Sequence, residues 1–388
     1  MPAGNAFISH GGGPTPVLNS SLAGVVEAMR GARLKQFWAG VGGLPGMRGV
    51  RAVDLFRAPP ATLARAAAQP GSYIRSYRGN ITDEDINRFV RFCRRQEIRY
   101  CFYSGGNGSM ATALRISIAA KEQNHELVVV GIPKTVDNDI CETDHSPGFG
   151  SAARFVAEAV RDIGLDQRGL PTPVSICEVM GRNTGWLAAA SILARYGPDA
   201  PPHFIYVPER PFDADEFLGR VERWLSRQGW VVGVVAEGLR DARGRMLSAA
   251  GGSSRDAKGR PLAGNCSAAL AALVSKRLKV RARSEKPGLL CRAFACCRSK
   301  VDAAEAYKTG QAAARAALDG RSGVMVSLQR ADSKLYRCQY SFVPLTSVAN
   351  RERTLDPSYL TPAGISRSYI DYVAPLAGKL AEPPIILL

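Results

Sequence analysis

The sequence feature that most limits the possible folds is a repeated order of apolar run, glycine-rich turn and helical stretch. The apolar run at 5–9 precedes Gly11-Gly12-Gly13 and a helical pattern at 18–29. A second run at 99–104 precedes a turn at 105–109, followed by a helical pattern that extends to Lys121. This order is typical of a doubly wound parallel sheet. Further strands are expected at 127–132, 174–179, 231–236, 324–329 and 336–343, and a further helix at 302–318.

The length of the chain predicts more than one domain. A chain of 388 residues exceeds what a single hydrophobic core usually supports. We therefore predict an α/β protein with two doubly wound domains and mainly parallel sheets. The first is expected over 1–148, with a return of the chain near 290–330, and the second over 149–290. Residues 331–388 are expected to supply C-terminal strands, helices and a tail that pack on the core.

Composition and charge exclude several classes of protein. Lys and Arg number 51 against 34 Asp and Glu, a net charge of +17, but the basic residues are dispersed and no DNA-binding motif accompanies them. We therefore expect no nucleic-acid partner. A basic surface would also attract polyanionic small molecules such as sugar phosphates. The nine cysteines are scattered without a C-x-x-C pair, which predicts reduced thiols rather than disulfides or a zinc site. With no membrane-length apolar run and no N-terminal signal pattern, a cytoplasmic protein without membrane contact is expected.

One segment between the predicted strands has the composition of a surface loop. Residues 241–264 are rich in Gly, Ser, Arg and Lys and have no apolar period. We predict a mobile surface loop there.

The two glycine-rich turns are candidate phosphate sites. Each would place bare backbone N–H groups at the N-terminus of a helix, where an anion can be bound. Either turn alone is equally consistent with a tight strand-to-helix connection that binds nothing. Neither matches a Walker A motif or a dinucleotide-binding fingerprint.

Two further segments carry residues suited to phosphoryl transfer. The first, at 131–139, places Lys134, Thr135, Asp137 and Asp139 directly after a predicted strand. A carboxylate can deprotonate a substrate hydroxyl, and a lysine can offset charge on a transferring phosphoryl group. The second, at 178–186, contains an arginine, Arg182, that could bind a phosphate through two N–H groups.

Taken together and in this order, these elements resemble the phosphofructokinase family over most of the chain. The matching segments are Gly12-Gly13, Gly105–Ser109, Gly131–Asp139, Glu178–Arg182, Val235–Gly238 and Pro287–Arg292. The resemblance implies a phosphofructokinase-like fold with a phosphoryl-donor domain over 1–148 and a sugar-phosphate domain over 149–290. It also implies phosphoryl transfer to the 1-hydroxyl of fructose 6-phosphate, which gives fructose 1,6-bisphosphate in glycolysis.

The resemblance assigns roles to individual residues. Asp137 is the expected general base, and Lys134 and Thr135 complete the catalytic set. The residues expected at the phosphoryl donor are Gly13, Arg78 and Gly108. The expected sugar-phosphate contacts are Thr135, Asp137, Met180, Gly181, Arg182, Glu237, Leu289 and Arg292.

The chain departs from the family pattern at three positions. Asn107 stands where the family has an aspartate that holds Mg²⁺, and an amide oxygen is a poorer ligand for a hard cation than a carboxylate. Mg²⁺ is still the expected cofactor, with Asn107 and Asp139 as weak candidate ligands. Leu289 replaces a histidine of bacterial ATP-dependent members, and Pro173 replaces an arginine that reaches a neighbouring subunit. These changes leave open a catalytically weak subunit that only binds sugar phosphate.

The phosphoryl donor is a separate question. At position 134 this chain has a lysine, as the pyrophosphate-dependent branch of the family does. The segments Asn183–Trp186 and Pro287–Leu290 are also similar to that branch. Gly108 leaves room for the α-phosphate of ATP, so an ATP-dependent phosphofructokinase is the alternative. Sedoheptulose 7-phosphate is an alternative acceptor. Family members pair across the sugar site, which implies a homodimer or homotetramer.

Overall fold

The computed structural model of this protein divides the chain into two compact units. Unit 1 comprises Met1–Phe149 and Arg292–Arg353, and unit 2 comprises Gly150–Cys291 and Thr354–Leu388. The region 331–388 is therefore shared between both units. The structure describes residues 4–32, 34–47, 49, 51–169, 172–247, 264–333, 335–362 and 364–383. Most of the predicted loop at 241–264 lies outside the described residues.

Unit 1 contains a seven-stranded sheet in the order β11-β10-β5-β4-β1-β2-β3. The five central strands are parallel, and β3 and β11 are antiparallel at the two edges. Strands β1, β4 and β5 are buried along almost their whole length, as expected where helices cover both faces of a parallel sheet. The strands are β1 Asn5–His10, β2 Phe37–Gly40, β3 Ala52–Asp54, β4 Ile98–Gly105, β5 Val128–Pro133, β10 Val324–Arg330 and β11 Cys338–Pro344.

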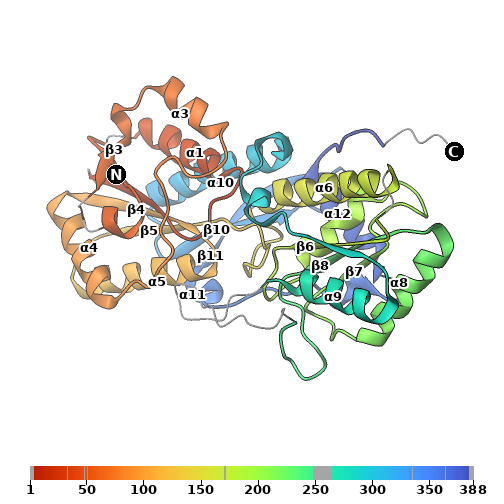
Figure 1. Cartoon of the computed structure of the whole chain (residues 1–388). Coiled ribbons are helices and arrows are strands. Elements are labelled where there is room, and N and C mark those ends of the chain that lie inside the picture. Colours follow the sequence, from red (N-terminus) through yellow and green to blue (C-terminus); the bar gives the residue numbers. More distant parts are fainter. Residues whose placement is uncertain are drawn as a thin grey trace. The chain divides into compact units, whose positions relative to one another are not determined.

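Helices cover both faces of this sheet (Figure 1). Helices α1, α3 and α10 pack in one apolar core, and α4, α5 and α11 pack in the other. Short 3-10 turns lie at Leu55–Arg57 and Ala295–Cys297, and a third at Gly288–Arg292 spans the division between the units. The helices are α1 Leu18–Arg30, α2 Leu44–Met47, α3 Pro60–Ala67, α4 Asp83–Arg95, α5 Asn107–Glu122, α10 Lys300–Leu318 and α11 Leu345–Val348.

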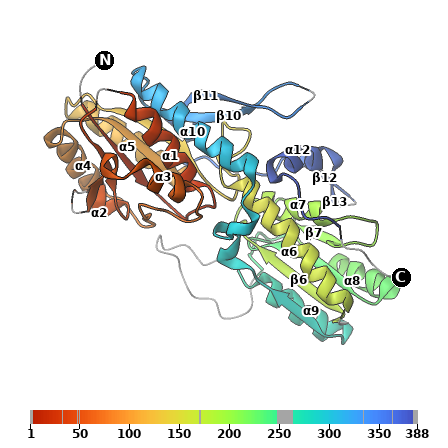
Figure 2. The same cartoon turned by 90° about the horizontal axis from the view of Figure 1, so that it is seen from above.

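Helices α1 and α10 lie side by side (Figure 2). A Cβ atom added at Gly310 would overlap the carbonyl oxygen of Ser21, and one added at Gly24 would overlap that of Tyr307. The two glycines therefore permit the close approach of the two backbones. This contact explains why a residue with poor helix propensity stands inside α10.

Unit 2 contains a four-stranded parallel sheet in the order β7-β8-β6-β9. Its core is formed by β6, β8, α8 and α9. The two small strands β12 Leu360–Thr361 and β13 Gly364–Ile365 form a separate antiparallel pair. The 3-10 turns are at Ser191–Ala194 and Pro357–Tyr359. The other elements are β6 Val174–Val179, β7 Phe204–Tyr206, β8 Val231–Ala236, β9 Ala282–Glu285, α6 Phe149–Gly169, α7 Trp186–Ala190, α8 Ala214–Gln228, α9 Cys266–Leu278 and α12 Arg367–Ala377.

The predicted fold class is confirmed: both main sheets are largely parallel and the connections are largely helical. Strands β6 and β8 have the predicted limits, and the other predicted strands differ by one or two residues at an end. The unpredicted strands β2, β3, β7 and β9 have three or four residues each, too few for a period to be recognised. No helix in the described part of the chain is long and apolar enough to cross a membrane.

Candidate functional site

The first glycine turn directly follows β1 and is bound to the segment that contains Arg78. The backbone N–H of Gly12 donates to the carbonyl oxygen of Tyr77 at 2.9 Å, and Ser76 Oγ donates to the carbonyl oxygen of Gly12 at 2.7 Å. Gly12 has a φ of +79°, which favours glycine. The exposed side chain of Arg78 thus comes from a segment held beside this turn.

The second glycine turn ends β4 and begins α5. Gly105 lies so close to the first turn that an added Cβ atom would overlap Ser109 Oγ and crowd the carbonyl oxygen of Gly11. Gly108, in the first turn of α5, is exposed. The two turns therefore meet at the carboxyl ends of neighbouring parallel strands, where open α/β sheets bind ligands.

Lys134 connects the end of β5 to the first glycine turn. Its side chain is buried, with 3% of the residue exposed. Its Nζ atom donates to the carbonyl oxygen of Gly11 at 2.9 Å and to that of Gly13 at 2.5 Å. The ammonium group is therefore fixed at the turn expected to bind the phosphoryl donor.

Several charged groups act on this ammonium. Burial, followed by repulsion from Arg292, lowers the pKa of Lys134 from 10.5 to about 8. Asp137 and Asp139 act in the opposite direction, and Arg78 lowers the pKa further. Two guanidinium groups therefore repel the Lys134 ammonium here, and a bound polyanion would offset that repulsion.

Arg292 lies beside the first glycine turn. A Cβ atom added at Gly13 would overlap its guanidinium group. The guanidinium group of Arg292 is therefore one of the charges that act on the Lys134 ammonium. The resemblance assigns this arginine to the sugar phosphate, a role that stays a prediction.

Asn107 and Asp139 form a pair in which the amide donates to the acid. Asn107 Nδ2 donates to the carbonyl oxygen of Asp139 at 3.1 Å and to its Oδ2 atom at 3.0 Å. Among the described residues, Asn107 Oδ1 and Asp139 Oδ1 are buried without a hydrogen-bond partner. Burial raises the pKa of Asp139, and Glu352 adds to this effect. Two buried oxygen atoms that need a partner suit a hard cation such as Mg²⁺.

Residues 134–148, which we call the carboxylate loop, turn back on themselves after Asp137. The Asp137 N–H donates to Thr135 Oγ1 at 3.1 Å. Thr135 N–H in turn donates to the carbonyl oxygen of Pro147 at 3.3 Å. Asn138 has a φ of 56° and accepts a hydrogen bond from Ser146 N–H on its Oδ1 atom at 3.0 Å. The loop therefore has internal bonds that define the position of its two carboxylates.

In unit 2, the predicted sugar contacts follow the ends of β6 and β8. The Gly238 N–H donates to the carbonyl oxygen of Gly181 at 3.2 Å. A Cβ atom at Gly181 would overlap the carbonyl oxygen of Thr184, and one at Gly238 would overlap that of Arg182. Burial raises the pKa of Glu237. The structure thus brings Gly181, Arg182 and Glu237 together at one edge of the sheet.

Met180 brings the 287–291 segment to the same edge. Cys291 Sγ lies 3.1 Å from Met180 Sδ. Leu289, by contrast, is 67% exposed. Of the predicted sugar-side residues in unit 2, Leu289 is thus the one whose side chain points mainly to solvent.

Glu178, the first residue of the 178–186 segment, has a structural role that the sequence pattern did not reveal. It accepts hydrogen bonds from the N–H groups of Asn265 and Ser267 at 3.0 Å each and forms an ion pair with Lys286 at 3.1 Å. Burial acts to raise the pKa of Glu178, but these partners lower it below its ordinary value. A carboxylate at the N-terminus of α9 is favoured by the helix dipole.

A buried histidine within the carboxylate loop was also not identified from the sequence. His145, Glu305 and Cys338 place possible metal-ligating atoms within 4.8 Å of one another among the described residues. Yet His145 Nδ1 donates to Asp144 at 2.9 Å and Nε2 to Glu305 at 2.7 Å, and Tyr336 OH donates to Glu305 at 2.6 Å. Burial alone would lower the pKa of His145, but the two carboxylates raise it to about 9. An imidazolium between two carboxylates explains this cluster without a metal.

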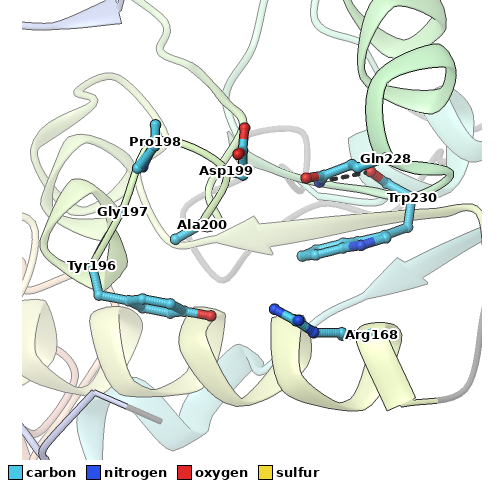
Figure 3. A pocket seen from close by; sticks show the side chains of 8 residues that line it. All are labelled: Arg168, Tyr196, Gly197, Pro198, Asp199, Ala200, Gln228 and Trp230. Carbon is cyan, nitrogen blue, oxygen red and sulfur yellow. Dashed lines mark hydrogen bonds between the residues drawn. The ribbon is translucent and has the colours of Figure 1, made fainter. Parts of the chain in front are cut away.

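Unit 2 also contains a cavity of about 400 Å³ that holds none of the predicted site residues (Figure 3). It lies where α6 ends and β8 begins, whereas the predicted sugar contacts follow the opposite ends of β6 and β8. Its lining residues are Arg168, Tyr196, Gly197, Pro198, Asp199, Ala200, Gln228 and Trp230.

Comparisons with known proteins agree with this architecture. The family model described as Phosphofructokinase matches residues 5–317. A pyrophosphate–fructose 6-phosphate 1-phosphotransferase from Xanthomonas campestris is 37% identical over 97% of this chain and 92% of its own length. A sulfofructose kinase from Alkalicoccus urumqiensis is 33% identical over 97% of this chain and 96% of its own. The crystal structure of a pyrophosphate-dependent phosphofructokinase from Marinobacter aquaeolei matches with a TM-score of 0.88 and 32% identity, covering 99% of this chain and 94% of that one. The chain therefore belongs to the phosphofructokinase family.

Proposed function

We propose that this protein transfers a phosphoryl group from pyrophosphate to the 1-hydroxyl of fructose 6-phosphate, giving fructose 1,6-bisphosphate and orthophosphate. The observation that carries the proposal is the buried ammonium of Lys134, bound to the carbonyl groups of Gly11 and Gly13 and three residues before Asp137. Pyrophosphate offers no adenosine for recognition. Fixed cations must therefore supply both the binding of pyrophosphate and the stabilisation of the transition state.

The residues of unit 1 divide the chemistry between them. Asp137 takes the proton of the sugar 1-hydroxyl, and the resulting oxygen nucleophile attacks one phosphorus atom of pyrophosphate. The bond between that phosphorus and the bridging oxygen breaks, and orthophosphate leaves with the bonding electrons. Lys134 and Arg78 balance the negative charge that shifts to the leaving group. Gly13 and Gly108 leave the backbone open to the donor.

Mg²⁺ is the proposed cofactor, and the donor set described above fits it. Asp139 would supply a carboxylate oxygen and Asn107 an amide oxygen. When bound, the ion would neutralise charge on the donor phosphates. Because an amide is the weaker ligand, we expect the metal to arrive largely bound to pyrophosphate.

The sugar phosphate is assigned to the residues at the ends of β6 and β8. Arg182 is proposed to bind the 6-phosphate and Glu237 to accept sugar hydroxyls, with Met180 and Gly181 shaping the site. Leu289 and Arg292 are kept as sugar contacts on the family resemblance alone. If Arg292 instead serves the donor, as its place beside Gly13 suggests, Arg292→Ala should raise the KM for pyrophosphate more than that for fructose 6-phosphate.

The decisive experiment compares donors and acceptors on the same preparation. Initial rates are measured with pyrophosphate and with ATP, each against fructose 6-phosphate and sedoheptulose 7-phosphate, over a range of Mg²⁺ concentrations. We expect pyrophosphate and fructose 6-phosphate to give the highest kcat/KM, and Asp137→Ala serves as the inactive control. Efficient use of ATP would instead assign the ATP-dependent activity, which the exposed Gly108 leaves sterically open. Inactivity with both donors would favour a subunit that only binds sugar phosphate.

A second acceptor has a specific reason to be tested. The relative named sulfofructose kinase matches this chain over almost its full length, so sulfofructose belongs in the same set of assays. A higher kcat/KM with sulfofructose than with fructose 6-phosphate would move the assignment to that acceptor.

We further propose a cytoplasmic homodimer or homotetramer. The support is the family's pairing of subunits across the sugar site. Light scattering of the purified protein distinguishes these assemblies from a monomer of 41.6 kDa.

A further inference from the structure

The carboxylate loop is bound by an arginine far along the chain. Arg353 Nη1 donates to the carbonyl oxygen of Thr143 at 2.8 Å and to that of Asp144 at 2.6 Å, and Nη2 donates to that of Asn138 at 3.3 Å. The backbone N–H of Arg353 donates to the carbonyl oxygen of Asp139 at 2.8 Å. One residue therefore bonds to four residues of the loop.

These bonds act on a segment of the loop that belongs to no strand, although Asp144 also donates its N–H to the carbonyl oxygen of Leu328 in β10 at 2.8 Å. Asn138, between the two carboxylates, is fully buried and has a left-handed conformation. A buried carbonyl group needs a partner, and a charged donor supplies a stronger bond than a neutral one. A guanidinium group also holds its donors in a fixed plane, so it can set the separation of residue 138 from residues 143 and 144.

We propose that Arg353 is a positioning residue for phosphoryl transfer, which holds Asp137 and Asp139 in place by binding backbone carbonyl groups of the carboxylate loop. The inference rests on the proposed function, because it takes its meaning from the roles of those two carboxylates. Arg353 lies outside residues 5–317, the part that matches the family model. It acts through the loop, and no contact of its own with the substrates is required.

The test separates a loss of positioning from a loss of binding. A catalytic group displaced by about 1 Å can cost about 10²-fold in rate. We expect Arg353→Ala to lower kcat about 10²-fold, while the KM for fructose 6-phosphate and that for pyrophosphate each change less than about threefold. Added guanidinium ion at millimolar concentration should restore part of the lost kcat in this variant. Hydrogen exchange measured by mass spectrometry should become faster in peptides that cover 136–146 and stay unchanged in those from β6 and β8.

A matched control changes the same charge two residues away. Arg351 is exposed, and Arg351→Ala should leave kcat and the exchange of the loop unchanged. If Arg353→Ala fails to fold, Arg353→Gln decides the question, since it keeps the length of most of the side chain but loses the charge and the fork of donors. A kcat within threefold of the wild type in the folded variant would overturn the proposal, as would a loss of kcat with unchanged loop exchange. A wild type inactive with every donor would refute the proposed function instead, and loop exchange in the Arg353 variants would still report whether the arginine holds the loop.

Discussion

Replacing Lys134 with methionine tests the role of its charge with the least disturbance of the fold. The side chain is buried, so a glycine would leave a cavity as well as removing the charge. Methionine has a similar length and is tolerated in irregular apolar spaces. A pKa of about 8 in place of 10.5 means that the folded protein disfavours this charge by about 3 kcal/mol. We therefore expect Lys134→Met to remain folded, although the carbonyl groups of Gly11 and Gly13 lose a donor.

The expected loss of activity follows from the position of the ammonium group. Removing one fixed electrostatic contact to the reacting group typically costs about 3–4 kcal/mol, or roughly 10²–10³-fold in kcat. The wild type should also show a pH effect that the variant lacks. Because the pKa of Lys134 is lowered, its ammonium is lost as the pH rises through about 8 in the free enzyme. The kcat/KM for pyrophosphate should therefore decline above pH 8 in the wild type, whereas Lys134→Met should be low throughout and show no such decline.

The assay couples orthophosphate release to a spectroscopic signal at fixed free Mg²⁺, with thermal unfolding as the check on the fold. Gly108→Asp serves as the donor control, because it should be nearly silent with pyrophosphate while crowding and repelling the α-phosphate of ATP. A folded Lys134→Met with kcat within fivefold of the wild type would refute the reasoning. So would a wild type that prefers ATP and loses that main activity through Gly108→Asp.

Other substitutions test the remaining roles. Asp137→Ala should lower kcat by roughly 10²–10⁴-fold with modest changes in KM, the usual result of losing a positioned general base, and steady-state rates that stay near normal would exclude that role. Arg182→Ala should raise the KM for fructose 6-phosphate far more than that for pyrophosphate, since a charge-assisted bond to phosphate is lost; the opposite ratio would mean that the two sites are reversed. Asn107→Asp should lower the Mg²⁺ concentration needed for half-maximal rate and increase the rise in melting temperature that Mg²⁺ produces, because a second carboxylate joins Asp139; an unchanged thermal shift would argue against this metal site. His145 has a raised pKa, so its stabilising charge is fully present below pH 6.5 and lost as the pH rises through about 9; the melting temperature of the wild type should fall between pH 7 and pH 10 more steeply than that of His145→Gln, and parallel profiles would contradict this assignment.

Much of the architecture and the identity of the motifs could be predicted from the sequence. The long buried strands and the glycine turns after them are local features, since an apolar run and a residue without Cβ act within a few positions. The segments at 131–139 and 178–182 likewise carry their chemistry in adjacent residues. Short strands such as β2 and β7 escaped prediction because three or four residues define no period.

The partners of those residues were decided only by the tertiary structure. Lys134 bonds to Gly11 and Gly13, 123 and 121 positions earlier, because β5 and β1 lie in one sheet with β4 between them. Arg353 reaches Asn138 across 215 positions for a similar reason, since its segment returns to the loop after β11. A local pattern specifies which strands form, but strand order and crossovers bring distant residues together. The sequence thus determined which groups could do chemistry, and the folded sheet decided which of them share a charge environment.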